Sequence, residues 1–112
     1  MKRDDRIRLL HIADALGSAI QFIEGHSRED LDKDAMLSFA LMHAIQIVGE
    51  AARKISQETR DQHPQIRWAD IIGMRHRLVH AYIDIDPDIL WETVTEAAPL
   101  LLTQVKSILD AD

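Results

Sequence analysis

The sequence predicts an all-α fold, an antiparallel four-helix bundle formed by a single domain over residues 1–112. Hydrophobic residues make up 46% of the chain and aromatic residues only 4%, a composition that favours aliphatic helix packing over a β-sandwich. Apolar residues recur at three- and four-residue steps in several stretches, and no stretch shows the alternation typical of a half-buried strand. A chain of this length is expected to form one domain with a modest core.

The first helix is expected from about Asp4 to Glu24, and Gly25 supplies its C-terminal stop. Its predicted apolar stripe is Ile7, Leu10, Ala13, Leu16, Ile20 and Ile23. The second helix is expected to begin within Ser27–Asp34, a run rich in capping residues and first-turn acids, and to extend to about Ile55. Its predicted apolar residues are Phe39, Met42, Ile45, Gly49 and Ala52.

The second half of the chain predicts two further helices. Residues 57–64 are polar, and Pro64 argues against a helix through them. The third helix is expected over roughly Trp68–Val79. Asp84–Pro87 is interpreted as a turn after which Asp86 caps a fourth helix, with Pro87 at its first position. The apolar residues of this helix are Leu90, Val94, Ala97, Leu101, Val105 and Ile108.

Pro99 lies inside the fourth helix and should kink it, because proline removes one backbone hydrogen bond and clashes with the preceding turn. Two of the predicted helices exceed 20 residues, which leaves apolar surface for contact with a second copy of the chain.

The composition also excludes several classes of protein. The chain has no cysteine, which excludes disulfides and thiolate metal sites. No stretch approaches the roughly 20 apolar residues of a membrane span, and the N-terminal residues lack the apolar core of a signal peptide. No nucleophile elbow or phosphate-binding glycine loop is present, and no cofactor is expected. A soluble, cytoplasmic protein is the expectation.

The charge is unevenly distributed. The net charge of −6 argues against a protein that coats nucleic acid nonspecifically. Residues 51–80 nevertheless carry six basic and three acidic residues, a net charge of +3. The basic residues are Arg53, Lys54, Arg60, Arg67, Arg75 and Arg77. Such a basic region suits a selective phosphate site or a surface for an acidic partner, and solvated helix-surface charge is the alternative interpretation.

The candidate chemistry lies between Arg75 and Tyr82, in the pattern R-x4-H-x-Y. Arginine is a permanent, forked cation that grips phosphate, and histidine can transfer protons near neutral pH, so Arg75 and His80 suggest metal-free attack on an RNA phosphodiester. On an ideal helix the two side chains are about 140° apart. Both therefore reach one phosphate only if the helix ends or distorts near Val79, or if a second subunit contributes. In the structural alternative, Arg75 pairs with an internal acid such as Glu50 and His80 caps the helix end.

Two other features near the motif have competing interpretations. His76 and His80 have the i, i+4 spacing of metal ligands, but the pattern lacks the Glu of H-E-x-x-H and a third ligand, so surface or capping histidines are preferred and no metal is expected. Gly49 lies in mid-helix, where glycine costs about 1 kcal/mol relative to alanine. It indicates close approach of another helix, or core packing alone, and Glu50 beside it is placed to orient Arg75.

These residues lie in segments that resemble the HepT-like ribonuclease toxins of the HEPN superfamily, small all-helical proteins encoded beside an MNT-type (minimal) nucleotidyltransferase antitoxin. In effect the resemblance covers the whole chain. The matching stretches are Val48–Ile55, Pro64–Trp68, Ile71–Tyr82, Asp84–Asp86 and Leu90–Trp91.

The resemblance implies a role for each residue of the motif. Arg75 and His80 match the catalytic arginine and histidine of the family. His76 stands where family members most often carry asparagine. Tyr82 matches the tyrosine to which the antitoxin adds AMP. The resemblance therefore implies the toxin of a type VII-like toxin–antitoxin system, a homodimeric, metal-independent RNA endonuclease that AMPylation of Tyr82 neutralises.

The main alternative is a non-catalytic HEPN-like subunit that binds a nucleotidyltransferase or a nucleotide. A plain helical scaffold and a metal-dependent hydrolase are weaker alternatives.

Overall fold

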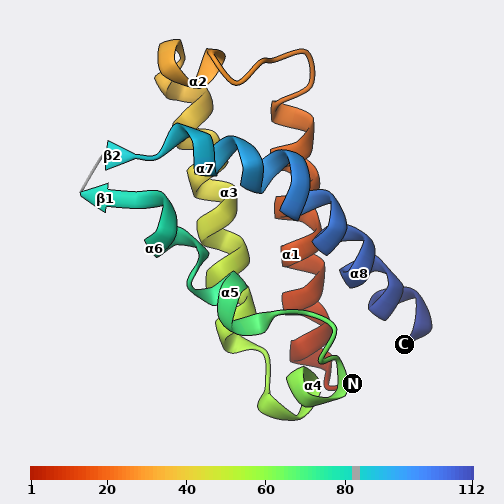
Figure 1. Cartoon of the computed structure of the whole chain (residues 1–112). Helices are drawn as coiled ribbons and strands as arrows, with labels where there is room; N and C mark the ends of the chain where they lie inside the picture. Colours follow the sequence, from red (N-terminus) through yellow and green to blue (C-terminus); the bar gives the residue numbers. More distant parts are fainter. Residues whose placement is uncertain (82–83) are drawn as a thin grey trace.

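Two long helices form the centre of the domain, α1 (Arg3–Phe22) and α3 (Ala35–Lys54), which lie side by side in the computed structural model (Figure 1). The structure describes the backbone of residues 1–81 and 84–112 and the side chains of residues 1–79 and 84–112. The all-α prediction is confirmed. Helical segments over residues 68–78 and 87–111 take the places of the third and fourth predicted helices.

The buried face of α1 differs from the predicted stripe in its N-terminal half. Leu9 and Ile12 are fully buried, whereas the predicted Ile7 and Leu10 are 36% and 42% exposed. In its C-terminal half, the predicted Leu16 is buried as expected. The helix carries apolar residues on two neighbouring faces. Its packing against both α3 and the C-terminal helix α8 (Ala98–Ala111) selects the face that is buried.

The second predicted helix is divided at Asp34. A short helix, α2 (Asp30–Lys33), ends there because Asp34 has an extended backbone, with φ −116° and ψ 90°. Its side chain accepts a hydrogen bond from the N–H of Leu37 at 3.0 Å and so caps α3. Of the predicted apolar residues of α3, Phe39 is 57% exposed and the others are buried.

The expectation that no stretch of the chain is long and apolar enough to span a membrane is wrong. Helix α3 is long and apolar enough to cross a membrane. The core helix of a globular protein passes the same test, and much of α3 is buried inside this domain.

Contrary to the prediction, the polar segment after α3 forms a short helix, α4 (Gln57–Gln62). The side chain of Ser56 caps it by accepting from the N–H of Thr59. Pro64 follows the end of the helix and therefore does not clash with it. Asp5, only 3% exposed, fixes this corner by accepting hydrogen bonds from Ser56 and Thr59.

The third predicted helix forms as two short helices, α5 (Trp68–Ile72) and α6 (Met74–Leu78), separated at Gly73. The chain then becomes extended in β1 (Val79–Ala81), which pairs antiparallel with β2 (Asp84–Ile85). Neither strand was predicted. Strands of three and two residues are too short to show an alternating pattern.

The fourth predicted helix forms as α7 (Pro87–Glu92), a π-helical turn (Thr93–Ala97) and α8 (Ala98–Ala111). Asp86 caps α7 as predicted, accepting from the N–H groups of Asp88 and Ile89 at 3.0 and 3.1 Å. This π turn ends two residues before Pro99, the position at which a kink was predicted. The wider turn shifts the buried face by one residue, so that Ala98 is buried and the predicted Ala97 is exposed.

Two apolar clusters form the core. One joins α1, the C-terminal half of α3, α5 and α8. The other joins the N-terminal half of α3 to α6, α7 and the end of α1. Helices α5 and α6 are therefore fixed to α3 through different clusters, and the surface between α3 and these two short helices positions the candidate site.

Candidate functional site

A hollow of about 180 Å³ lies between the C-terminal half of α3 and the α5–α6 segment. We call it the α3–α6 hollow. Its polar lining consists of Gln46, Glu50 and Arg53 from α3 and Arg75 and His76 from α6. Three of the predicted site residues, Glu50, Arg75 and His76, are therefore brought together by elements that are separate in sequence.

Gly49 lies where the two walls of the hollow come close to each other. It is buried, and a Cβ at this position would lie 3.5 and 3.6 Å from the carbonyl oxygens of Ile71 and Ile72. The close approach predicted from a mid-helix glycine is confirmed. Both distances correspond to ordinary van der Waals contact, so the approach itself would also accommodate alanine.

Arg75 lines the hollow from α6 with an exposed side chain. Within the described part of the chain, its guanidinium forms no ion pair or hydrogen bond. The alternative in which Glu50 neutralises Arg75 is therefore not observed. The Glu50 carboxylate instead accepts a hydrogen bond from Nε2 of Gln46, one turn earlier on α3, at 3.1 Å. Arg75 is thus a cation available to an anionic ligand.

Helix α6 ends at Leu78, which agrees with the first of the two alternatives for bringing Arg75 and His80 to one phosphate. Val79, which follows the last residue of α6, is extended, with φ −112° and ψ 115°. The backbone of His80 therefore lies in β1 instead of continuing the helix, and the 140° separation expected on one helix does not apply. The side chain of His80 and the whole of Tyr82 lie outside the described residues.

The described side chains form no group of three or more His, Cys, Asp or Glu residues that could hold a metal ion. Of the predicted His76–His80 pair, the structure describes only the side chain of His76, which is exposed at the hollow.

Some of the basic residues between positions 51 and 80 have structural roles. The Arg60 guanidinium donates to the carbonyl oxygens of Ala52, Arg53 and Ile55, which closes the C-terminal end of α3. Arg67 pairs with Asp70 at 2.8 Å. Arg53 and Arg75, in contrast, line the α3–α6 hollow.

Gln46 and Arg53 were missed as site residues by reasoning from the sequence. The available signal was their spacing: they lie four residues before and three residues after Glu50, and such residues share one face of a helix.

Comparison with known proteins places the chain in a family. Residues 12–108 match the family model described as "Ribonuclease HepT-like". The chain is 37% identical over 101 residues to "Probable ribonuclease HepT" of Thermococcus cleftensis, covering 90% of this chain and 92% of that protein. It is 36% identical over 104 residues to a "Putative RNase" of Caldanaerobacter subterraneus subsp. tengcongensis, covering 93% of both.

A "Putative RNase" of Methanocaldococcus jannaschii is 30% identical over 107 residues, covering 96% of this chain and 98% of that protein. No solved structure matches closely enough to extend the comparison. The match to the family model spans most of the domain, and these relatives are similar over nearly their whole length. The chain therefore belongs to the HepT-like ribonuclease family.

Proposed function

We propose that this protein is a metal-independent RNA endonuclease that acts through Arg75 and His80, as the toxin of a type VII-like toxin–antitoxin system in the cytoplasm. The observation that carries the proposal is the state of Arg75. Its guanidinium is exposed at a hollow and has no ion pair within the described residues, and α6 ends before His80. An unneutralised forked cation, followed at a helix end by a proton-transferring side chain, suits a phosphodiester substrate.

In this mechanism His80 accepts the proton of a ribose 2′-hydroxyl, and the 2′-oxygen attacks the adjacent phosphorus. The bond from phosphorus to the 5′-oxygen breaks, which leaves a 2′,3′-cyclic phosphate and a 5′-hydroxyl. Arg75 stabilises the charge that develops on the phosphoryl oxygens. In the homodimer, His80 of the partner subunit gives a proton to the leaving 5′-oxygen.

His76 and Glu50 support the site in this proposal. His76 lines the hollow beside Arg75 and supplies an additional hydrogen-bond donor toward phosphate. Glu50 is held by Gln46 at 3.1 Å, and its carboxylate lines the same hollow as Arg75. It orients the guanidinium once RNA draws Arg75 inward.

The test is cleavage of total RNA by the purified protein in excess EDTA. Wild type should produce fragments with cyclic phosphate ends and leave single-stranded DNA intact, because DNA lacks the attacking hydroxyl. His80→Ala and Arg75→Ala should each lower the rate by about 10²-fold or more. Arg77→Ala is the matched control, since Arg77 is an exposed arginine of the same helix that lines a different hollow.

Two outcomes would decide against this function. Loss of cleavage on adding EDTA would identify a metal-dependent hydrolase. No cleavage by wild type, once mass spectrometry showed that Tyr82 carried no AMP, would favour the alternative of a non-catalytic subunit that binds a nucleotidyltransferase or a nucleotide.

We propose further that an MNT-type nucleotidyltransferase neutralises the toxin by transferring AMP to Tyr82. The added phosphodiester would place a bulky anion seven residues from Arg75 in the chain and two from His80, where it would compete with RNA for the cationic site. Tyr82→Phe should keep the ribonuclease activity and resist neutralisation when the two proteins are co-expressed. Equal protection of cells that express wild type or Tyr82→Phe would refute this mode of control.

A further inference from the structure

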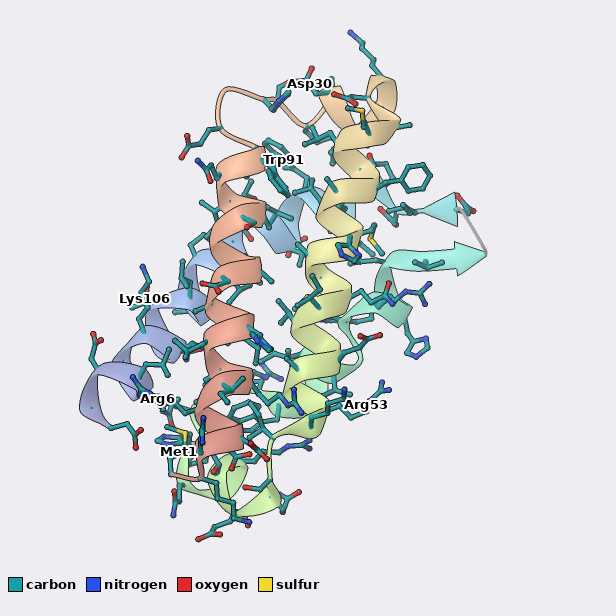
Figure 2. The ribbon with its side chains drawn as sticks, turned by 180° about the vertical axis from the view of Figure 1, so that it is seen from behind. Met1, Arg6, Asp30, Arg53, Trp91 and Lys106 are labelled. Carbon is teal, nitrogen blue, oxygen red and sulfur yellow. The ribbon has the colours of Figure 1, made fainter. Side chains whose placement is uncertain are left out.

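Arg53 lines the α3–α6 hollow from α3, across from Arg75, and has no place in the R-x4-H motif. It lies in the last turn of α3, near the C-terminal end of that helix in Figure 2. Its side chain is exposed. The hollow therefore has a permanent cation on each of its two walls, one from each helix.

Folding does not account for the charge of Arg53. Within the described residues, its guanidinium forms no ion pair or hydrogen bond. The usual structural role of a cation at a helix C-terminus is to interact with the last carbonyl groups. Here Arg60 does so, donating to the carbonyl oxygens of Ala52 and Arg53 itself at 2.9 and 2.7 Å. The Arg53 guanidinium is left available for a ligand.

We infer that Arg53 is a phosphate-binding residue that holds a non-scissile phosphate of the RNA strand whose scissile phosphate lies at Arg75. This inference rests on the proposed function. Glu50, one turn before Arg53, lines the same hollow, and its negative charge disfavours one phosphate shared by both arginines. At about 180 Å³ the hollow is also smaller than the roughly 300 Å³ at which enclosed ligand pockets begin. It suits the backbone of a strand lying across it.

The first experiment measures binding without cleavage, using a 2′-O-methyl single-stranded RNA of mixed sequence over a range of salt concentrations. Arg53→Ala should bind about fivefold more weakly at low salt. The slope of log affinity against log salt should fall in magnitude by about 0.7, the value for one lost phosphate contact on a single strand. Arg53→Lys should be intermediate, because it keeps the charge and loses the fork.

Lys54→Ala is the matched control. Lys54 is an exposed basic residue in the same last turn, and it does not line the hollow. It should change affinity less than twofold and leave the salt slope unchanged. Equal effects of Arg53→Ala and Lys54→Ala would overturn the inference, because nonspecific charge would then explain both. Circular dichroism of each variant confirms that the fold is retained.

The second experiment separates the two phosphates by substrate length. A mixture of ribodinucleotides offers only the scissile phosphate, whereas a longer RNA also offers its neighbours. Arg53→Ala should cleave the longer RNA about fivefold less efficiently, chiefly through KM, and should lose clearly less on dinucleotides. An equal loss on both substrates would place Arg53 at the scissile phosphate and overturn the inference. If wild type without AMP on Tyr82 cleaves neither dinucleotides nor the longer RNA, the proposed nuclease is refuted instead. The binding experiment then still tests whether Arg53 binds phosphate.

Discussion

Substitution of Asp5 tests how the start of α4 is held against α1. Its carboxylate, 3% exposed, accepts three hydrogen bonds from α4 and its cap. The donors are the backbone N–H of Ser56 at 2.9 Å, the Ser56 hydroxyl at 2.6 Å and the Thr59 hydroxyl at 2.7 Å. Replacing Asp5 by alanine removes the acceptor for all three and leaves their donors inside the protein.

The expected loss follows from these contacts. A hydrogen bond to a charged group contributes about 1.5–3 kcal/mol, and the cost of desolvating the carboxylate opposes the sum of the three. A buried donor left without a partner costs about 1–3 kcal/mol, and the Ser56 and Thr59 hydroxyls still bond to each other, so the three lost bonds together should cost about 3 kcal/mol. Asp5→Ala should therefore lower the free energy of unfolding by about 3 kcal/mol and the melting temperature by roughly 12 °C for a domain of this size.

The same site should make stability depend on pH. Burial alone raises the pKa of Asp5. The hydrogen bonds from Ser56 and Thr59 and the nearby charge of Lys2 together outweigh this effect, so that the pKa lies below the ordinary value of 3.8. A depressed folded-state pKa gives stability that is fully present above the unfolded pKa and is lost as the pH falls through the folded pKa. The difference in stability between wild type and Asp5→Asn should therefore be constant near neutral pH and shrink below pH 3.8.

Urea titrations followed by far-UV circular dichroism at a series of pH values measure both effects. Asp5→Asn is the appropriate reference because it keeps the shape and removes the titrating group. A loss below about 0.5 kcal/mol for Asp5→Ala would place the site among ordinary surface substitutions and refute the argument. A wild-type-to-Asn difference that does not change in acid would refute the pKa argument separately.

Two further substitutions test how the C-terminal end and the middle of α3 are held. Arg60→Ala should lower the free energy of unfolding by about 2 kcal/mol, because it removes the guanidinium that donates to the last carbonyls of α3, and urea titration should show Arg60→Lys to be less harmful. Gly49→Ala should raise the free energy of unfolding by about 0.5–1 kcal/mol, since the new Cβ meets only ordinary contacts and alanine favours the helix. A destabilised Gly49→Ala would show that the packing of α5 on α3 has no room for a methyl group.

The start of α7 at Asp86 was predicted, whereas the start of α3 was predicted only to lie within the run Ser27–Asp34. Asp34 and Asp86 both act through local hydrogen bonds to N–H groups two or three residues on, and such signals lie within a few residues of sequence. The buried face of α1 was not predictable in the same way. Its apolar residues cover two faces, and only the packing of α3 and α8 decides that Leu9 and Ile12 are buried while Leu10 is not.

The candidate site was likewise predictable where it depends on local sequence and not where it depends on packing. The spacing of Arg75 and His80 identified a possible phosphate site, but whether one helix carries both depends on where α6 ends, which the pairing of β1 with β2 helps to fix. Arg53 was counted among the basic residues without being assigned to the site. Its place in the hollow depends on how α6 is packed against α3, and Arg60 shows that a neighbouring arginine of the same charge has a structural role instead.

This dependence of the site on the placement of α6 leads to a prediction at Gly73, the residue between α5 and α6. A Cβ there would lie 3.3 Å from the carbonyl oxygen of Ala69, tighter than an ordinary contact, so this carbonyl or the backbone at Gly73 would have to shift by a few tenths of an ångström. Alanine also adopts the φ of −88° found at Gly73, and replacing glycine lowers the entropy of the unfolded chain, worth about 0.4–1 kcal/mol. This offsets the crowding, and the free energy of unfolding of Gly73→Ala should change by less than about 1 kcal/mol.

Gly73→Ala should affect the proposed ribonuclease activity more strongly than it affects the free energy of unfolding. A shift at Gly73 moves Arg75 and His76 relative to Glu50 on α3, and catalysis is sensitive to displacements well below 1 Å. We expect kcat/KM for Gly73→Ala to fall about fivefold or more, while Gly49→Ala, which adds the same methyl group at an ordinary contact on the opposite wall, keeps wild-type activity. Wild-type activity of both variants would mean that the position of α6 does not control the reaction. A fall in both would mean instead that the spacing of the two walls, and not the start of α6 alone, positions Arg75.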